Sequence, residues 1–490
     1  MSTSKKLIKQ TAIYGLATVF PRMLSFLLVV LYTGTLPKTN DYGSLTIIMS
    51  YMVFLNVLLS YGMETAFFRF YNLENDKEKV LSSSTVSIFW SSIIFLVFSL
   101  VFRRTIAHSL GIETEFVTYT VWILVLDALV IIPFSKLRVL QKSMTYALVK
   151  MGNVSINLGF NLFFLLVLPA LAQQNYPFWK SIYLENFQVG YILIANILAS
   201  LFTFLFFIKE YATLDWQLDY NLWKKMMHYG LPILIAGIAF AVNEHFDKII
   251  LGKLLPENIA KAEVGVYSAC YKLALFMTLY ATAFRLGIEP FFFSYAQQKN
   301  ASATYAQITK YFIVFGAIIL VGVLVFIDVL KVFLLQNKAY WEAIGVVPLI
   351  LVANFFLGIY TNLSVWYKLN NKTHIGAYIS IVGALVTLVL NFWLIPLYSY
   401  YGSAVATIFA YGSMMFLSYY LGQKQYPIPY PIKEISIYLG SSIAIGFGVF
   451  YFLRAQYWIT IPVLALYLGW IYKQEKIFFQ KILRAKETKG

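Results

Sequence analysis

The sequence predicts an all-α protein that crosses a membrane about fourteen times, as two bundles of six helices followed by two further helices. Three observations support this fold class: long apolar runs, an uneven distribution of Lys and Arg between the loops, and an approximate internal repeat. The composition agrees, because 60% of the 490 residues are hydrophobic and only 12% are charged. Soluble domains carry about 25% charged residues.

Each predicted helix is an apolar run of about 20 residues, the length needed to cross the hydrocarbon core of a bilayer. The runs at 45–63, 192–208 and 379–395 contain no charged residue. We place the helices at 11–31, 42–61, 82–101, 116–133, 146–168, 187–208, 229–251, 264–284, 311–330, 343–367, 375–394, 403–421, 435–453 and 459–472. No loop between them is long enough to bury its own core, which excludes a soluble catalytic domain.

The loops predict that both termini lie on the cytoplasmic side. In this orientation Lys and Arg are about threefold more frequent in the inner segments than in the outer ones, as the positive-inside rule requires. The same rule explains the net charge of +16. Because no zinc-finger spacing or RNA-binding motif is present, we expect no nucleic-acid partner. The single cysteine excludes an intrachain disulfide framework.

The two six-helix bundles are predicted from a repeated pattern. A basic pair, Tyr-Gly-Leu, a span and Leu-Pro occur in this order around Tyr14-Gly15-Leu16 and again around Tyr229-Gly230-Leu231. Both first helices run from inside to outside, so the halves are parallel copies, as in some transporter folds. We predict an N-terminal half at 1–215, a C-terminal half at 216–425, and two extra helices with a basic tail at 426–490.

This pattern resembles the polysaccharide flippases, of the O-antigen and exopolysaccharide type, in the multidrug/oligosaccharidyl-lipid/polysaccharide exporter superfamily, whose members have a MATE-like fold. The most specific stretch is Tyr229-Gly230-Leu231-Pro232, followed by Asp247-Lys248 and by Val264-Gly265-Val266-Tyr267. Asp-Arg is usual at the Asp247-Lys248 position, and lysine keeps the charge but loses the bidentate fork of arginine.

The resemblance implies a transporter that is not an enzyme. Its substrate would be an undecaprenyl-diphosphate-linked oligosaccharide repeat unit, moved from the cytoplasmic to the outer leaflet of a bacterial inner membrane for lipopolysaccharide or other polysaccharide synthesis. Membrane lipids, a polysaccharide polymerase and glycosyltransferases are the implied partners. No cofactor is implied, and coupling to Na⁺ or H⁺ is left open.

Three alternatives stay open on the sequence. A cation-coupled multidrug or metabolite antiporter has the same fold, and architecture alone does not separate the two. A lipid II flippase is a nearer relative, but its first half usually carries more arginines near the bilayer midplane. A membrane enzyme such as a polymerase generally needs a large external loop or an acidic catalytic cluster, and neither is present.

Charged residues inside the apolar runs are the first site candidates, because the bilayer makes each of them costly unless it is paired or hydrated. Arg22 lies about 17 Å into the first helix at 1.5 Å per residue, and Asp127 lies near the middle of the fourth helix. One interpretation is a cavity cation for diphosphate with Asp127 as its partner or as a coupling site. The other is a buried structural pair within the first half.

The seventh helix carries Glu244, Asp247 and Lys248, and Lys272 is expected at a similar depth in the eighth. Glu244 and Lys248 are four residues apart in the favourable acid-first order, and Asp247 with Lys272 forms a second candidate pair. These residues are candidates for a cation-coupling site or a gate. The structural alternative is a clamp at the mouth of the helix hairpin.

Arg69 and Arg285 lie at the inner ends of matching spans in the two halves. They are candidates for contact with substrate phosphates, or they are simple positive-inside anchors. Glu64 is the expected partner of Arg69, and Glu289 is that of Arg285.

Two prolines near the starts of the halves, Pro21 and Pro232, are hinge candidates, because proline removes a backbone hydrogen bond and kinks a helix. Prolines are also common in membrane helices without a special role. The four histidines show no ligand spacing, so we expect no metal site. No sequence signature of a catalytic triad is present.

Overall fold

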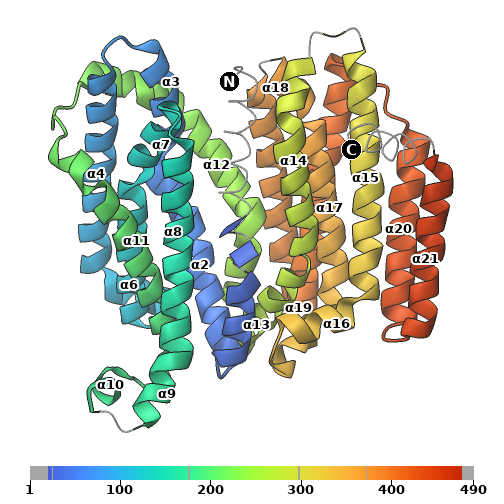
Figure 1. Cartoon of the computed structure of the whole chain (residues 1–490), viewed down its shortest axis with the longest axis horizontal. Coiled ribbons are helices and arrows are strands. Elements are labelled where there is room, and N and C mark those ends of the chain that lie inside the picture. The colour runs from blue at the N-terminus through green and yellow to red at the C-terminus, as the bar shows by residue number, and fades with distance from the viewer. Residues whose placement is uncertain are drawn as a thin grey trace, which may run out of the picture.

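The computed structural model describes residues 20–476, apart from 22, 25, 175–176, 296–297, 299 and 371. Every regular element in this part of the chain is a helix, which confirms the predicted fold class. Figure 1 shows two side-by-side bundles, with early helices such as α4, α6, α8 and α11 in one and later helices from α14 onward in the other. The predicted boundaries at 215/216 and 425/426 remain predictions.

The helices fall into an early and a later group along the chain. The early ones are Phe26–Thr35, α2 Thr39–Ser60, α3 Met63–Leu73, α4 Lys77–Val101, α5 Arg103–Leu110, α6 Thr114–Leu129, α7 Ile131–Val139, α8 Ser143–Leu162, the π-helix η1 Phe163–Val167, α9 Leu168–Gln173, α10 Pro177–Ile182 and α11 Gln188–Ala212. The later ones are α12 Tyr220–Leu254, α13 Glu257–Leu273, α14 Leu275–Tyr295, α15 Ala301–Val325, α16 Ile327–Leu334, the 3₁₀ helix η2 Lys338–Val346, α17 Val347–Leu363, α18 Val365–Leu369, α19 Thr373–Gln425, α20 Ile432–Phe452 and α21 Tyr457–Gln474.

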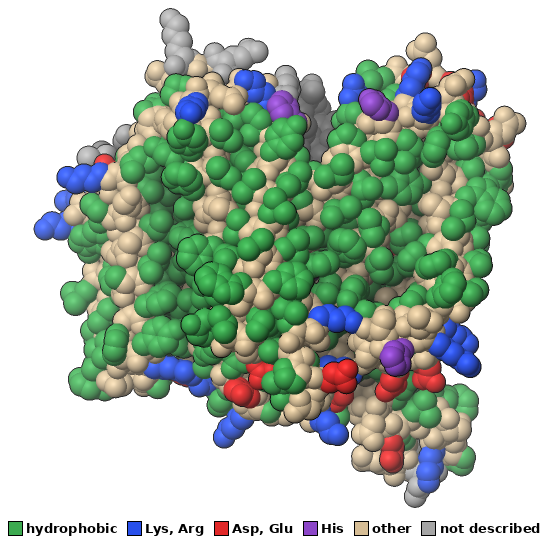
Figure 2. Space-filling model, turned by 180° about the vertical axis from the view of Figure 1, so that it is seen from behind, with side chains coloured by type: hydrophobic (Ala, Val, Ile, Leu, Met, Phe, Trp, Pro, Cys, Tyr) green, Lys and Arg blue, Asp and Glu red, His purple; other side chains and the backbone are tan. Residues whose placement is uncertain are grey.

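Ten helices in the described part are long and apolar enough to cross a membrane, and the bent pair α13 and α14 adds an eleventh if it is one span. Figure 2 shows the matching surface, a broad hydrophobic band between upper and lower rims where the charged side chains gather. Such a band is what a lipid-facing surface requires, because charges are costly in hydrocarbon. The count of fourteen remains a prediction.

Helix α19 explains part of the difference between the ten or eleven spans of the described structure and the fourteen spans predicted from the sequence. It has 53 residues, and a straight helix of that length would extend about 80 Å, far beyond a hydrocarbon core of about 30 Å. The chain instead folds back at Ser399, which has a non-helical φ of 48° and ψ of −133°. The Ser403 hydroxyl consequently donates to Oδ1 of Asn391 at 2.8 Å, although the two residues are twelve apart. The spans predicted at 375–394 and 403–421 therefore both lie within α19.

The bundles meet at a close crossing of α2 and α13. A Cβ atom added to Gly43 would lie 1.8 Å from the carbonyl oxygen of Lys261, and one added to Gly265 would lie 2.1 Å from that of Thr39. No side chain fits in either place, so the two backbones touch directly. Gly43 and Gly265 occupy comparable places, near the start of the second helix of each predicted half.

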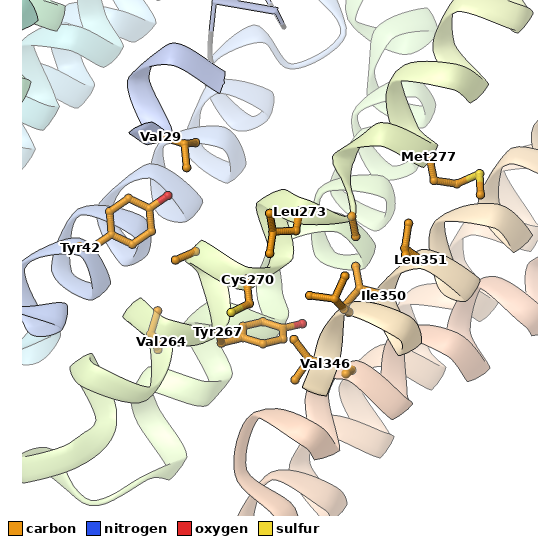
Figure 3. Close-up of a cluster of buried hydrophobic side chains, with 14 of the residues drawn as sticks. Val29, Tyr42, Val264, Tyr267, Cys270, Leu273, Met277, Val346, Ile350 and Leu351 are labelled. Carbon is orange, nitrogen blue, oxygen red and sulfur yellow. The ribbon is translucent and has the colours of Figure 1, made fainter. Parts of the chain in front are cut away.

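A hydrophobic cluster surrounds this crossing and joins the two bundles. Figure 3 shows Val29 and Tyr42 from the first bundle on one side of Val264, Cys270 and Leu273 of α13, with Ile350 and Leu351 of α17 on the other side. All seven are at most 4% exposed. The crossing lies toward the lower end of Figure 1, where α13 is labelled, and there the two bundles are in direct contact.

The two extra helices are fastened to α15 and α16 by ion pairs at both ends. Lys310 of α15 contacts Glu434 and Glu475 at 2.6 Å each, and Arg454 contacts Asp328 of α16 at 2.8 Å. These contacts make α20 and α21 an attachment to the second bundle, at a distance from the contact between the bundles (Figure 1).

Candidate functional site

Three cavities follow one another between and within the two bundles. The first-half cavity, of about 500 Å³, lies among α2, α6, α7, α8 and α11. The central cavity, of about 430 Å³, is lined by α2, α8, α11, α12 and α13. The second-half cavity, of about 370 Å³, lies among α12, α14, α17, α18 and α19. Val53 lines both the first and the central cavity, and Glu244 lines both the central and the second-half cavity, so the three spaces adjoin.

The structure brings five of the predicted site residues to these walls. Asp127 lines the first-half cavity. Glu244, Lys248 and Lys272 line the central cavity, and Arg285 lines the second-half cavity together with Glu244. Arg22 lies outside the described residues, so its relation to Asp127 stays a prediction.

Asp247 lies behind the cavity wall in a buried ion pair. It is 2% exposed, and both of its carboxylate oxygens accept hydrogen bonds from Nζ of Lys248, at 2.8 and 2.9 Å. The Tyr267 hydroxyl donates to Oδ2 at 2.8 Å, and the ring of Tyr271 lies 4.2 Å from Nζ of Lys248. The predicted pair of Asp247 with Lys272 is therefore wrong, because the neighbouring lysine reaches the carboxylate first.

Lys272 on the central wall and Arg285 on the second-half wall are cations without an ionic partner in the described chain. Lys150 on the first-half wall also has no ion pair there, and its Nζ lies 5.4 Å from the ring centre of Phe134. Neither Lys272 nor Arg285 makes a hydrogen bond or an ion pair with any residue that the structure describes. A charged group placed in a membrane protein without a protein partner needs water or an ionic ligand to offset its desolvation. The two positions therefore form an anion-binding arrangement along the path from the central to the second-half cavity.

The other predicted pairs at the helix ends are also rearranged. Glu64 contacts Arg138 at 2.5 Å instead of Arg69, while the guanidinium of Arg69 lies 4.3 Å from the ring centre of Tyr229. Arg69 thus stands at the junction of α3 and α12 and lines none of the first-half, central and second-half cavities.

On the second-half side, Glu289 contacts Lys368 at 2.6 Å instead of Arg285. Lys368 lines the second-half cavity. Because Glu289 pairs with Lys368, it does not neutralise Arg285, whose charge stays available on the wall of the second-half cavity.

Asp127 is held by a serine of α11. The Ser200 hydroxyl donates to Oδ1 of Asp127 at 2.7 Å, and Lys150 of α8 lines the same cavity. The cavity wall also carries Asn153 and Thr203, whose side chains bond to each other at 2.9 Å. The first-half cavity is therefore polar and contains charges of both signs.

Helix α12 packs on both bundles, and Pro232 lies between the two contacts. Before the proline, the indole nitrogen of Trp223 donates to Ser87 of α4 at 2.8 Å. After the proline, the Asn243 side chain donates to the carbonyl oxygen of Ser380 at 3.0 Å, and it accepts from Thr387 at 3.0 Å. Pro232 is thus placed where a change in the angle between the bundles would bend the helix.

The N-terminal hinge candidate, Pro21, lies at the start of the described chain. Its neighbour Arg22 is outside the described residues, so a hinge at Pro21 stays a prediction.

Sequence reasoning missed several polar residues of the walls because they carry no charge or lie near helix ends. Asn56, Asn153, Asn157 and Asn196 line the first-half or central cavity. Asn153 and Asn157 are four residues apart on α8, and this spacing is the sequence signal that could have identified these two residues. In the described part of the chain no group of three or more His, Cys, Asp or Glu residues could hold a metal ion.

The comparisons with known proteins agree with this architecture. A family model described as "Polysaccharide biosynthesis protein" matches residues 7–293. No curated protein matches the sequence. The solved structure of the lipid II flippase MurJ in its inward closed conformation aligns with a TM-score of 0.73 at 16% identity, over 96% of this chain and 100% of that chain.

Two MATE structures align less closely. A MATE in the straight conformation has a TM-score of 0.58 at 13% identity, over 89% of this chain and 96% of that one. An inward-facing multidrug resistance transporter of the MOP superfamily has a TM-score of 0.59 at 12% identity, over 85% and 95%. At these identities the matches show the fold, and they confirm the predicted MATE-like architecture.

Proposed function

Because the chain belongs to the polysaccharide biosynthesis protein family, we propose that it moves oligosaccharide repeat units linked to undecaprenyl diphosphate across the membrane. Transport runs from the cytoplasmic to the outer leaflet of a bacterial inner membrane, and both termini are cytoplasmic. The repeat units then become substrates for polysaccharide or O-antigen assembly by a polymerase. The protein itself performs no covalent chemistry.

The observation that carries this proposal is the pair of unpartnered cations on adjoining cavity walls. Lys272 of α13 lines the central cavity, Arg285 of α14 lines the adjoining second-half cavity, and within the described chain neither has an ionic partner. A diphosphate is the part of the substrate that hydrocarbon excludes most strongly, and charge-assisted hydrogen bonds from Lys and Arg are its natural partners. The polyprenyl tail can stay in the bilayer while the head group passes through the polar space.

The direct contact of α2 with α13 and the three adjoining cavities support alternating access. In this state the crossing of Gly43 and Gly265 blocks one side. Transport requires that the bundles rock so that this crossing separates and the opposite ends approach. Pro232 lies inside α12, and bending of the helix there accommodates the change of angle.

A transport assay tests the proposal. The purified protein is reconstituted in vesicles with an undecaprenyl-diphosphate-linked oligosaccharide that carries a fluorescent sugar, and a membrane-impermeant quencher reports the accessible fraction. Labelled lipid in the inner leaflet is protected from the quencher. We expect this protected fraction to become accessible only in vesicles that contain the protein. Loss of transport in Lys272→Met, with normal transport in the exposed-lysine variant Lys225→Met, supports the role of the cation. Wild-type protein that leaves the protected fraction unchanged contradicts the proposal.

A second candidate function, cation-coupled antiport of a small molecule, is favoured by the carboxylates of Glu244 and Asp127 on the cavity walls. Experiments with the same vesicles distinguish transport that is coupled to an ion gradient from uncoupled flipping. Imposed Na⁺ and H⁺ gradients are applied one at a time, and a gradient that accelerates transport identifies the coupling ion. Equal rates in all conditions indicate downhill flipping.

A further inference from the structure

One face of α8 carries a line of amide side chains through the membrane-spanning part of the first bundle. Asn153, Asn157 and Asn161 follow one another at intervals of four residues, which places them on the same side of the helix. Asn153 lines the first-half cavity and Asn157 lines the central cavity. Other faces of α8 are apolar and exposed, as at Met144 and Leu148. The line therefore follows the cavity wall and is absent from the lipid-facing surface of this helix.

The amide groups in this line differ in their hydrogen bonding. Asn161 is fully buried; its Oδ1 accepts from the Tyr32 hydroxyl at 3.1 Å, and its Nδ2 donates to the backbone and side-chain oxygens of Asn157. The Nδ2 of Asn153 donates to the carbonyl oxygen of Ala199 and to Thr203. Asn161 and Asn153 are thus anchored in the protein.

Three amides on the walls remain open toward the cavities. The Nδ2 group of Asn157, and the whole side-chain amides of Asn56 on α2 and Asn196 on α11, make no hydrogen bond with any residue of the described chain. A polar group without a hydrogen bond is costly in a membrane protein. These amides therefore require water or a polar ligand in the cavity.

The central cavity consequently has two chemically different walls. The first bundle contributes Asn157 and Asn196, which are uncharged. The second bundle contributes Glu244, His245, Lys248 and Lys272. Asp247 neutralises Lys248, so Lys272 is the cation of this wall that has no ionic partner in the described chain. An amide offers two donors and an acceptor, so it matches a sugar hydroxyl, which both donates and accepts. An ammonium group offers donors and a full charge, so it matches a phosphate.

We propose that the amide wall of the first bundle, formed by Asn56, Asn157 and Asn196, binds the hydroxyl groups of the sugar, while Lys272 on the wall of the second bundle holds the diphosphate. This inference rests on the proposed function and adds to it the site and the chemistry of sugar recognition. The first-half cavity, which continues from this wall, has about 500 Å³. That volume is within the range of about 300–1,000 Å³ for small-molecule sites, so it accepts part of an oligosaccharide.

Binding measurements with two lipids test the inference. The probes are bare undecaprenyl diphosphate and undecaprenyl diphosphate that bears a disaccharide, and each is titrated into the protein in lipid nanodiscs. For the wild type we expect the glycosylated lipid to bind about 10-fold more tightly, since two or three hydrogen bonds contribute roughly this factor. In the double variant Asn157→Leu with Asn196→Leu we expect the ratio to fall to about 1.

The bare lipid is the internal control for folding. Its affinity should be unchanged in the double variant, because Lys272 is unchanged. Ser155→Leu, an exposed position on another face of α8, is the matched control and should keep the 10-fold ratio. The single variant Asn196→Leu, which removes no hydrogen bond within the described chain, should lose part of the ratio even if the double variant is unstable.

The outcomes separate the two proposals. A wild type that binds both lipids equally, or an Asn196→Leu variant with an undiminished ratio, overturns the amide wall and leaves the proposed function in place. A wild type that binds neither lipid overturns the proposed function, and the amide wall with it.

Discussion

Gly43 and Gly265 touch backbone to backbone where α2 crosses α13. The amide nitrogen of Gly265 lies 3.1 Å from the position that a Cβ atom of Gly43 would occupy, and the reverse distance is 3.2 Å. The two residues come from comparable positions in the two predicted halves, so the contact is nearly symmetric. Because this contact holds the two bundles together at one end, it must separate before that end of the space between them can open.

Replacement of either glycine by alanine should open this crossing. An added methyl group overlaps a backbone carbonyl that cannot move alone, and overpacking of this kind costs about 1–3 kcal/mol or more. We expect Gly265→Ala to lower the melting temperature in detergent and to increase the labelling of a cysteine placed at Ser44 by an impermeant thiol reagent. Gly448→Ala is the control, because a Cβ there meets nothing within 4 Å. Equal labelling in the two variants would contradict a closing role.

Breaking the buried pair of Asp247 and Lys248 should destabilise the protein strongly. Removal of one partner leaves an uncompensated buried charge, which costs about 3–5 kcal/mol. We expect Asp247→Asn and Lys248→Met each to lower the melting temperature, and the double variant to recover part of the loss. The exposed pair of Asp76 and Lys79 is the control, since such pairs contribute about 0–1 kcal/mol. Additive losses in the double variant would exclude the pairing.

The charge on Arg285 should determine diphosphate binding. Loss of a charge-assisted hydrogen bond costs about 1.5–3 kcal/mol, or roughly 10- to 100-fold in affinity. We expect Arg285→Leu to weaken the binding of undecaprenyl diphosphate by this factor and Arg285→Lys to keep part of the affinity. Titration in nanodiscs measures the effect, with Lys225→Met as the control. Full affinity in Arg285→Leu would remove this residue from the site.

Pro232 should affect the rate of transport more than substrate affinity. Replacement by alanine restores a backbone hydrogen bond and straightens the helix, which opposes the bending needed when the bundles rock. We expect Pro232→Ala to slow transport several-fold in vesicles while the affinity for undecaprenyl diphosphate stays within about twofold. Pro462→Ala is the matched control, because Pro462 is also inside a helix, α21, but far from the contact between the bundles. Equal transport rates in the two variants would argue against a hinge.

The sequence by itself determined the class of the fold and most of the spans. Apolar length and loop charge act locally, because a bilayer imposes the same requirement on every crossing segment. The repeat around Tyr14-Gly15-Leu16 and Tyr229-Gly230-Leu231 was also visible in the sequence, but the contact of Gly43 with Gly265 was not. The hairpin at Ser399 was anticipated as two spans.

Only the tertiary structure decided which charges meet. Glu64 pairs with Arg138, Glu289 with Lys368, and Asp247 with Lys248, and each differs from the pairing predicted from the sequence. A long side chain can reach several partners at nearly equal cost, so the choice depends on helix rotation and on packing between segments far apart in the chain. The four-residue spacing aligns the asparagines of α8 along one face, but only the packing places Asn157 and Lys272 on the walls of the same cavity and Arg285 on the wall of the next one.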